Sequence, residues 1–399
     1  MKSFKMIQWL SLVLLLLFGC CCCMGGTLIV HNPGMSFIAH LIRYHCQDNI
    51  IVSPASFHDG LIHLLMGTRG ASADEMMAKL QLNRQQLNEH LQRSIFNKTI
   101  YNSTMQMANR LYVDRRLWLL ERYKLDIYRY FHTKVEHVDF RSIDGTVDTI
   151  NGWMAKNRQE NIKDMLSWID PDSRMVLVTA FDFHGEWAKP FDPNHTTKEF
   201  FETPQQNGEN VPKSLVDMMH IREKFARGYI EEVCAHVIFL PYKHANLSMV
   251  VLLPRDSNGI DYIKRNIHEV DLQALEPSEP PVEMELSLPR FQIEYRTDVS
   301  NIIKTMGIRL IFSPSANFSG LTKQQGVRLN QFIHRVHILA DEGGYNTSVA
   351  SASVQLKQSV VKRSVEAQSF TVNHPFFFCI KDKKRMYVAG IVNRIPINL

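Results

Sequence analysis

The chain has 399 residues, 45% of them hydrophobic and 21% charged, which is enough for one large folded domain or two ordinary ones. Its formal net charge is only +5 and its basic residues are scattered, so a nucleic-acid partner is not expected. The one basic run, 381–385, lies between two apolar segments, where a solvated hairpin turn is favoured over a polyanion-binding patch.

The N-terminus has the layout of a secretory signal peptide. Lys2 and Lys5 precede a short apolar core at 10–18, and small residues follow as far as Gly26. This pattern predicts that residues 1–25 are removed and that the protein is secreted to the extracellular space without stable membrane association. Two alternatives stay open: an uncleaved anchor, since the apolar stretch continues to residue 24, and lipid attachment to the cysteine run 20–23.

Passage through a secretory pathway is also favoured by six glycosylation triplets, at Asn97, Asn102, Asn194, Asn246, Asn317 and Asn346. Beyond the leader, three cysteines remain, Cys46, Cys234 and Cys379, and their spacing fits neither a disulfide framework nor a zinc site. We expect them to be small buried hydrophobic residues. The scattered histidines 236, 244, 334 and 337 form no metal motif, and no metal or other cofactor is predicted.

Hydrophobic periodicity predicts a mixed sequence of helices and strands. Helices are expected at 36–44, 54–67, 70–75 continuing through 76–96, 117–130, 147–166, 260–270 and 299–306. Strands are expected at 49–52, 105–113, 135–140, 175–181, 235–242, 247–254, 282–293, 327–339 and 370–372. The run 175–181 is apolar throughout, as in a central strand covered on both faces. No βα repeat or linker divides the chain, which indicates one α+β domain over 27–399.

One stretch, 341–378, is unusual. It opens with Asp341-Glu342-Gly343-Gly344, continues through small and polar residues without proline, and reaches the basic pair Lys362-Arg363 before an apolar block. Such a run has little to bury and is expected at the surface, yet it is compatible with a strand. We interpret it as an exposed, cleavable loop that attracts proteases and is able to join a sheet.

Seven segments, in this order, make the chain resemble the serpin family from about residue 30 to the C-terminus: 49–56, 66–70, 108–112, 183–191, 240–242, 288–291 and 317–321. The resemblance implies a single-domain fold of three β-sheets and eight to nine helices, with an exposed reactive-centre loop at about 342–369. In inhibitory members a protease cleaves this loop, which then inserts into the large sheet and traps the acyl-enzyme. The resemblance also assigns a shutter set under that sheet, consisting of Ser53, Ser56, Thr179 and His334.

The resemblance further assigns a hinge at the start of the loop: Glu342, Gly344, Tyr345, Thr347 and Val349. Glu342 and Gly344 match the family pattern, whereas Tyr345 stands where threonine or serine is usual and Thr179 stands where asparagine is usual. A tyrosine facing inward in an inserted strand would cost about 1–3 kcal/mol of overpacking, unless its hydroxyl finds a partner.

Two positions compete as the reactive bond. Spacing from Glu342 favours Gln358-Ser359, whereas chemistry favours Arg363-Ser364, since trypsin-like pockets hold an acid that pairs with arginine. We favour Arg363 and keep Gln358 as the alternative.

The sequence therefore predicts a secreted, monomeric, suicide-type inhibitor whose partner is an extracellular, trypsin-like serine protease. The alternative is a non-inhibitory member, such as a carrier, binding protein or protease decoy, which Tyr345 and the Ser/Thr-rich hinge favour. An enzyme is not expected, because no nucleophile-elbow, zincin, P-loop or dinucleotide motif is present. His58-Asp59 near Ser53 suggests a triad only superficially, since adjacent helical residues point in different directions.

Overall fold

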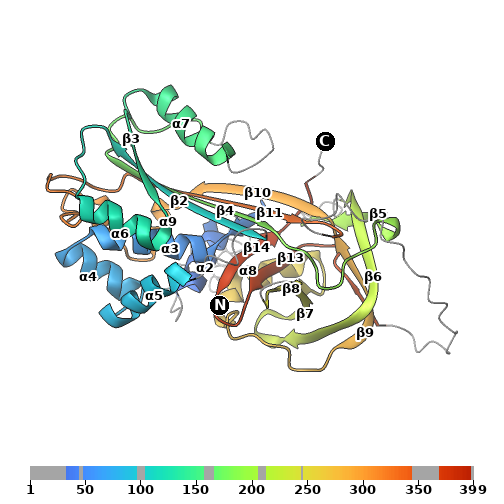
Figure 1. Cartoon of the computed structure of the whole chain (residues 1–399). Coiled ribbons are helices and arrows are strands. Elements are labelled where there is room, and N and C mark those ends of the chain that lie inside the picture. The colour runs from blue at the N-terminus through green and yellow to red at the C-terminus, as the bar shows by residue number, and fades with distance from the viewer. Residues whose placement is uncertain are drawn as a thin grey trace, which may run out of the picture.

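A computed structural model describes residues 33–44, 48–96, 104–156, 166–204, 213–243, 246–343 and 368–396. Within these ranges the chain forms eight α-helices (Figure 1): α2 Pro33–Tyr44, α3 Pro54–Gly67, α4 Gly70–Lys79, α5 Arg84–Phe96, α6 Glu121–Phe131, α7 Ile143–Lys156, α8 Ile260–Asn266 and α9 Ser300–Thr305. The strands are β1 Ile50–Val52, β2 Met105–Asp114, β3 Lys134–Val138, β4 Met175–His184, β5 Thr197–Glu202, β6 Lys213–Ile230, β7 Ala235–Pro241, β8 Ser248–Pro254, β9 Val282–Pro289, β10 Phe291–Asp298, β11 Gln331–Ala340, β12 Gln368–Thr371, β13 Phe376–Lys381 and β14 Met386–Val392.

Five strands form one sheet in the order β10-β11-β4-β2-β3. The apolar run predicted as a central strand is β4, which pairs antiparallel with β2 on one side and parallel with β11 on the other. The β4–β11 pairing is direct and covers nine positions, from Val176 opposite Gln331 to His184 opposite Leu339. We call this junction the seam.

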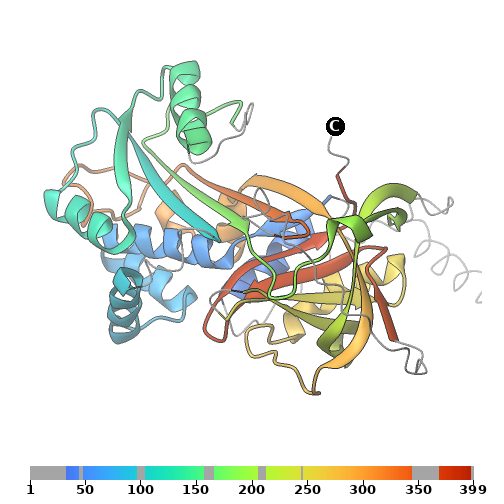
Figure 2. The same ribbon diagram turned by 45° about the vertical axis from the view of Figure 1, so that its right-hand side comes forward.

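Different helices cover the two faces of this sheet. On the outer face, Ile150 and Met154 of α7 pack in one cluster with Val178 of β4 and Ile333 of β11. Figures 1 and 2 show α7 lying on this face, apart from the other helices. On the inner face, α2 and α3 join a second cluster that includes Leu177 of β4. Burial on both faces explains why β4 is apolar at almost every position.

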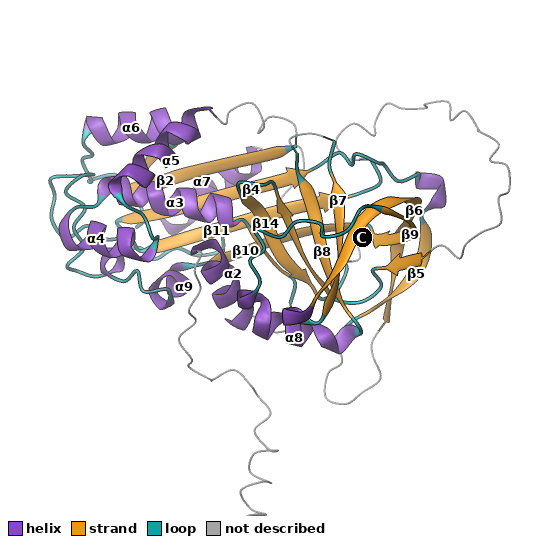
Figure 3. Ribbon diagram, turned by 90° about the horizontal axis from the view of Figure 1, so that it is seen from below, coloured by secondary structure: helices purple, strands orange, loops and turns teal. Residues whose placement is uncertain are grey.

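The remaining nine strands form a second connected sheet in the order β1-β14-β13-β8-β7-β6-β9-β12, with β5 also paired to β6. Figure 3 shows this sheet at the end of the molecule away from α4 and α6. The serpin resemblance implied three sheets, and here two of them are joined because β6 is 18 residues long. Its last residues, 226–230, pair with β7, whereas 218–225 pair with β9.

The prediction of a single strand over 282–293 is wrong. The chain forms β9 up to Pro289 and β10 from Phe291, and these two strands belong to different sheets. Proline cannot donate to a strand ladder and favours a strand end. Arg290, between them, donates its N–H to the carbonyl oxygen of Asp217 over 2.8 Å, which fixes the point at which the chain passes from one sheet to the other.

The continuous helix predicted over 76–96 is also interrupted. Gln81 has a φ of 55° and separates α4 from α5. The side chain of Asn83 accepts from the N–H of Gln86 over 2.8 Å, and the side chain of Gln86 accepts from the N–H of Asn83 over 2.9 Å. This reciprocal pair is a capping box, which starts a new helix at α5.

Two predictions about surface and core residues need correction. Cys234 was expected to be buried and is exposed, whereas Cys379 is fully buried and Cys46 lies outside the described residues. The basic turn between β13 and β14 is the predicted hairpin, but Lys381 is buried and Arg385 donates to the carboxylate of Asp59 over 2.6 Å. Among the helices that the structure describes, none combines the length and apolarity needed to cross a bilayer.

Candidate functional site: the loop anchors and the seam

The predicted reactive loop is fixed at its two ends in different sheets. β11, in the five-stranded sheet, precedes it, and β12, in the nine-stranded sheet, follows it. Residues 344–367 lie outside the described residues. These include the hinge residues Gly344, Tyr345, Thr347 and Val349, both candidate reactive bonds (Gln358-Ser359 and Arg363-Ser364), and the sequon Asn346.

The first anchor begins at Asp341, directly after β11. Its carbonyl oxygen accepts from the indole Nε1–H of Trp187 over 2.7 Å, and its carboxylate lies 3.0 Å from Nε2 of His184. Trp187 itself stacks on Tyr242, with ring centroids 4.5 Å apart. Gly185 allows this close packing, because a Cβ there would lie 2.5 Å from the Tyr242 ring.

Glu342, the first hinge residue, completes this anchor. It is 7% exposed, and its carboxylate accepts from the hydroxyl of Thr196 over 2.8 Å. The guanidinium of Arg290 lies 3.4 Å from the same oxygen, and the carbonyl oxygen of Glu342 accepts from the N–H of Phe191 over 2.9 Å. The start of the loop is therefore held by three residues outside β11: Thr196, Arg290 and Phe191.

The second anchor is β12 and the residues after it. β12 pairs parallel with β9 over four positions, and the N–H of Val372 donates to the carbonyl oxygen of Ser287 over 2.9 Å. The N–H of Glu202, at the end of β5, donates to the carbonyl oxygen of Asn373 over 2.8 Å. The segment from Phe191 to Glu202 thus contacts the chain at both ends of the loop.

The structure brings the four predicted shutter residues together on the inner face of the seam. The N–H of Ser53 donates to Nε2 of His334 over 3.0 Å, and the hydroxyl of Ser53 accepts from the N–H of Ser56 over 3.1 Å. Thr179 Oγ1 lies 2.8 Å from Nδ1 of His334. The hydroxyl of Ser56 is buried and has no partner among the described residues. Threonine at 179 therefore still closes a hydrogen-bonded bridge between β4 and β11.

These contacts determine the tautomer of His334. Burial lowers the pKa of His334 to about 3, so the ring is neutral at physiological pH. Because Nε2 accepts from Ser53, the ring proton is on Nδ1 and donates to Thr179. The Thr179 hydroxyl then has its own proton for the carbonyl oxygen of Ile333, at 3.5 Å.

A second bridge crosses the seam on the outer face. Arg335 of β11 is fully buried, and its guanidinium contacts Asp182 of β4 and Glu294 of β10. Burial by itself lowers the pKa of Arg335, but the two carboxylates outweigh it and the net shift is upward. The guanidinium is therefore charged. No role for Arg335, Asp182 or Glu294 was predicted from the sequence. The sequence held one signal for this bridge: Arg335 is a charged residue within β11, a strand whose other residues are mostly buried.

The His58-Asp59 pair does not form a triad with Ser53. Asp59 is 3% exposed. Its carboxylate accepts a hydrogen bond from the guanidinium of Arg385 over 2.6 Å and lies 3.1 Å from Nε2 of His90. Burial raises the pKa of Asp59, but Arg385 and His90 together lower it to about 2. His58, Asp59 and His90 are the one group within the described ranges whose donor atoms lie close enough for a metal ion, at most 4.8 Å apart. The Arg385 cation already neutralises the carboxylate, which argues against a second cation there.

The described sequons lie at the surface. Asn194, Asn246 and Asn317 are exposed, so their side chains are accessible to a glycan. Asn97, Asn102 and Asn346 lie outside the described residues.

Comparison with known proteins agrees with this geometry. The family model described as "Serpin (serine protease inhibitor)" matches residues 31–394, and the chain belongs to the serpin family. It is 27% identical to human Serpin B9 over 366 residues, covering 88% of this chain and 95% of that protein. It is 29% identical to serine protease inhibitor 42Dd of Drosophila melanogaster over 365 residues, covering 88% and 93%.

Solved structures extend the similarity of fold. Human thyroxine-binding globulin in complex with thyroxine superposes with a TM-score of 0.78 at 20% identity, over 92% of this chain and 98% of that one. Uncleaved ovalbumin superposes with a TM-score of 0.76 at 23% identity, over 92% and 99%. At these identities the likeness shows the fold alone. The similar proteins therefore include one named as a serine protease inhibitor and one solved in complex with thyroxine.

Proposed function

We propose that this serpin is a secreted inhibitor of a trypsin-like serine protease that is cleaved after Arg363 and traps the protease by inserting the cut loop into the seam. The partner is an extracellular protease, and the inhibitor acts as a monomer. Loop insertion is the family's established example of the release of stored strain, and the question for this chain is whether its own seam and loop allow it.

The observation that carries the proposal is the parallel pairing of β4 and β11. Parallel pairs are slightly less stable per residue than antiparallel pairs. The loop leaves from the end of β11, so a segment that folds back into the seam runs antiparallel to both strands. Insertion would therefore replace one parallel pairing of nine positions by two antiparallel pairings. The gain in strand hydrogen bonds favours the inserted state once cleavage frees the loop.

The composition of the loop also supports insertion. From Gly343 to Leu356 the chain has no charged residue and no proline, and this run is longer than the nine paired positions of the seam. The predicted inward-facing set is Tyr345, Thr347, Val349, Ser351 and Ser353. Four of these five are small enough to enter a packed sheet without overpacking, and Tyr345 is the exception.

The test is incubation of the secreted protein with trypsin, followed by denaturing gels and mass spectrometry. An adduct of summed mass, with a released peptide that begins at Ser364, supports both trapping and the reactive bond. Arg363→Gln should abolish the adduct, whereas Lys362→Gln, its matched neighbour, should retain it. A peptide that begins at Ser359 would keep the inhibitor but assign the bond to Gln358.

Secretion is a separate part of the proposal, and it has its own test. The apolar leader and the exposed sequons Asn194, Asn246 and Asn317 support it. Expression in a secretory cell should give a protein in the medium that lacks residues 1–25 and loses mass on glycosidase treatment. A full-length product retained in membranes would indicate the uncleaved anchor.

A non-inhibitory role is the second candidate, and Tyr345 is the observation that favours it. A large side chain in an inward-facing position slows insertion, so the loop would be cut without trapping. The fold is shared with thyroxine-binding globulin in complex with thyroxine, which makes a carrier or binding role compatible with it. Cleavage by trypsin without an adduct, and without a rise in melting temperature, would decide for this candidate.

A further inference from the structure

The exposed side of β5 and β6 carries an apolar pair. Phe200 and Leu215 are direct partners in the β5–β6 ladder, and they are 63% and 51% exposed. Their chain neighbours Phe201 and Val216 are buried together in a core cluster. Side chains that are directly opposite in a strand pair touch, so Phe200 and Leu215 form one apolar patch on the surface. In Figures 1 and 3 these strands lie at the end of the molecule away from α4.

An ion pair flanks the apolar pair on each side. Nζ of Lys198 lies 2.7 Å from the carboxylate of Asp217, and Nζ of Lys213 lies 3.0 Å from the carboxylate of Glu202. Each ion pair joins two residues that are opposite one another in the ladder. Alternate residues of a strand are about 6.6 Å apart, so each ion pair lies roughly that far from the apolar pair. We call this surface the β5–β6 face, and it consists of Lys198, Phe200, Glu202, Lys213, Leu215 and Asp217.

Polar contacts hold the β5–β6 face in place at both ends. Asp217 also contacts the guanidinium of Arg290, which in turn contacts Glu342 at the first anchor of the loop. At the other end, the N–H of Glu202 donates to the carbonyl oxygen of Asn373 over 2.8 Å. A surface that is already ordered loses little entropy when a partner docks on it. An apolar centre within a polar rim is also the usual anatomy of a protein interface.

The charges of the face alternate in sign around the apolar pair. On β5 a lysine precedes Phe200 and a glutamate follows it, and on β6 each of these charges is opposed by a charge of the other sign. A two-fold axis along the strands would turn a second copy over so that Lys198 of one copy meets Asp217 of the other. An axis across the strands would instead bring Lys198 of one copy against Glu202 of the other. In both arrangements every charge lies against an opposite charge, and the apolar pairs meet at the centre.

We propose that the β5–β6 face is the contact between two copies of this chain in a reversible, two-fold symmetric dimer. The charge pattern favours a second copy because it is complementary to itself, whereas a partner surface of one sign would meet two like charges. Six residues on each side are far fewer than the roughly 20–30 of a standard interface, so the dimer is weak. Dilute protein is therefore monomeric, as proposed for the acting inhibitor, and the dimer does not depend on the inhibitory function.

The test is sedimentation equilibrium of the secreted protein over about 5–300 µM, a range that suits a weak dimer. We expect the average mass to rise from that of one chain toward that of two as the concentration increases. Phe200→Thr with Leu215→Thr should weaken the association about tenfold or more, because the apolar centre is lost while strand propensity is retained.

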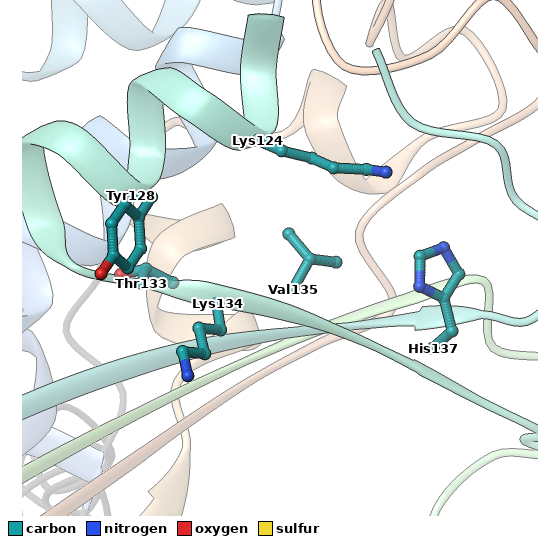
Figure 4. Close-up of a pocket in the computed structure, with 6 residues that line it drawn as sticks. All are labelled: Lys124, Tyr128, Thr133, Lys134, Val135 and His137. Atoms are coloured by element: carbon teal, nitrogen blue, oxygen red, sulfur yellow. The ribbon is translucent and has the colours of Figure 1, made fainter. Parts of the chain in front are cut away.

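The control changes an equally exposed apolar residue elsewhere. Leu125 of α6 is 67% exposed, and this helix also borders a hollow of about 330 Å³ (Figure 4). Lys134 points to the other side of β3 from the hollow, and Lys124 pairs with Glu121 over 2.8 Å, so the charges there do not converge on a partner. Leu125→Gln should change the association of two copies less than about twofold.

A charge swap locates the symmetry axis of the dimer. Glu202→Lys with Lys213→Glu keeps an ion pair within the ladder but reverses its direction. If the axis runs along the strands, opposite charges of the two copies still meet and the dimer is retained. If the axis runs across the strands, like charges meet and the dimer weakens about tenfold or more.

The proposal is overturned if the mass stays that of one chain up to the highest concentration, both before and after glycosidase treatment. The treatment removes any glycan at Asn194, the sequon closest to β5 in the sequence. Equal weakening by the apolar double variant and by Leu125→Gln would also overturn it, because that result would indicate non-specific apolar association. Thermal melting of each variant checks that the fold is retained.

Discussion

Arg335 and Asp182 form an ion pair across the seam, with Nη1 of Arg335 3.1 Å and 3.2 Å from the two carboxylate oxygens of Asp182. Neighbouring strands are about 4.8 Å apart, so a strand inserted between β4 and β11 roughly doubles that separation. The Arg335–Asp182 contact cannot survive this change. The contact of Arg335 with Glu294 can, because β10 and β11 remain neighbours. The pair therefore stabilises only the closed seam.

Asp182→Asn should accelerate conversion to the inserted form and lower the stability of the closed form by about 1–3 kcal/mol, because a buried guanidinium loses one of its two carboxylates. Melting temperature and the rate of loop insertion after cleavage measure the two effects. Glu136→Gln is the matched control, since the Arg110–Glu136 pair joins β2 to β3 and does not cross the seam. Equal acceleration in both variants would contradict a role specific to the seam.

Thr179→Val should destabilise the closed form by about 1–3 kcal/mol, because the Nδ1–H of His334 loses its acceptor in a buried site. Urea unfolding measures the loss. Thr179→Ser retains the hydroxyl and is the control, and Thr179→Asn should also retain the bridge, since its amide oxygen accepts. If valine and serine variants unfold alike, the hydroxyl contributes nothing and the shutter role of Thr179 is wrong.

Tyr345→Thr should increase the fraction of cleaved molecules that form the protease adduct. The substitution removes about 1–3 kcal/mol of overpacking from the inserted state, so insertion competes better with hydrolysis of the acyl-enzyme. The measured quantity is the ratio of adduct to cleaved product on a denaturing gel. Tyr262→Thr, on the surface of α8, serves as the control. An unchanged ratio would show that Tyr345 does not limit insertion.

The stability of the protein should fall as the pH drops below 6.5, and His63→Phe should reduce this dependence. His63 is fully buried, neither ring nitrogen has a partner among the described residues, and burial lowers its pKa to about 3. Because the unfolded state binds a proton at pH 5 and the folded state does not, protonation favours unfolding. One such histidine costs about 2 kcal/mol at pH 5.

The measurement is the free energy of unfolding in urea at pH 7.5 and pH 5 for both proteins. His58 and His334 also have pKa values lowered to about 3, so the variant should retain part of the dependence. Identical differences between the two pH values in wild type and variant would contradict the buried, neutral state of His63.

Much of the architecture follows from local patterns in the sequence. The apolar run at 175–181 became β4, the helix expected over 299–306 became α9, and the strands expected at 235–242 and 247–254 paired as β7 and β8. Motifs in order along the chain were enough to predict the family. These features depend on periodicity and on residues close in sequence, which is why they could be predicted.

The pairing of residues distant in sequence depended on the tertiary structure. Nothing local predicts that Arg335 meets Asp182, which is 153 positions away, or that Asp59 is neutralised by Arg385. The sequence by itself determined where most of the helices and the apolar strands lie, but it did not separate β9 from β10 or α4 from α5. Only the tertiary structure decided which charges lie together, because strand order and register bring distant side chains within hydrogen-bonding distance.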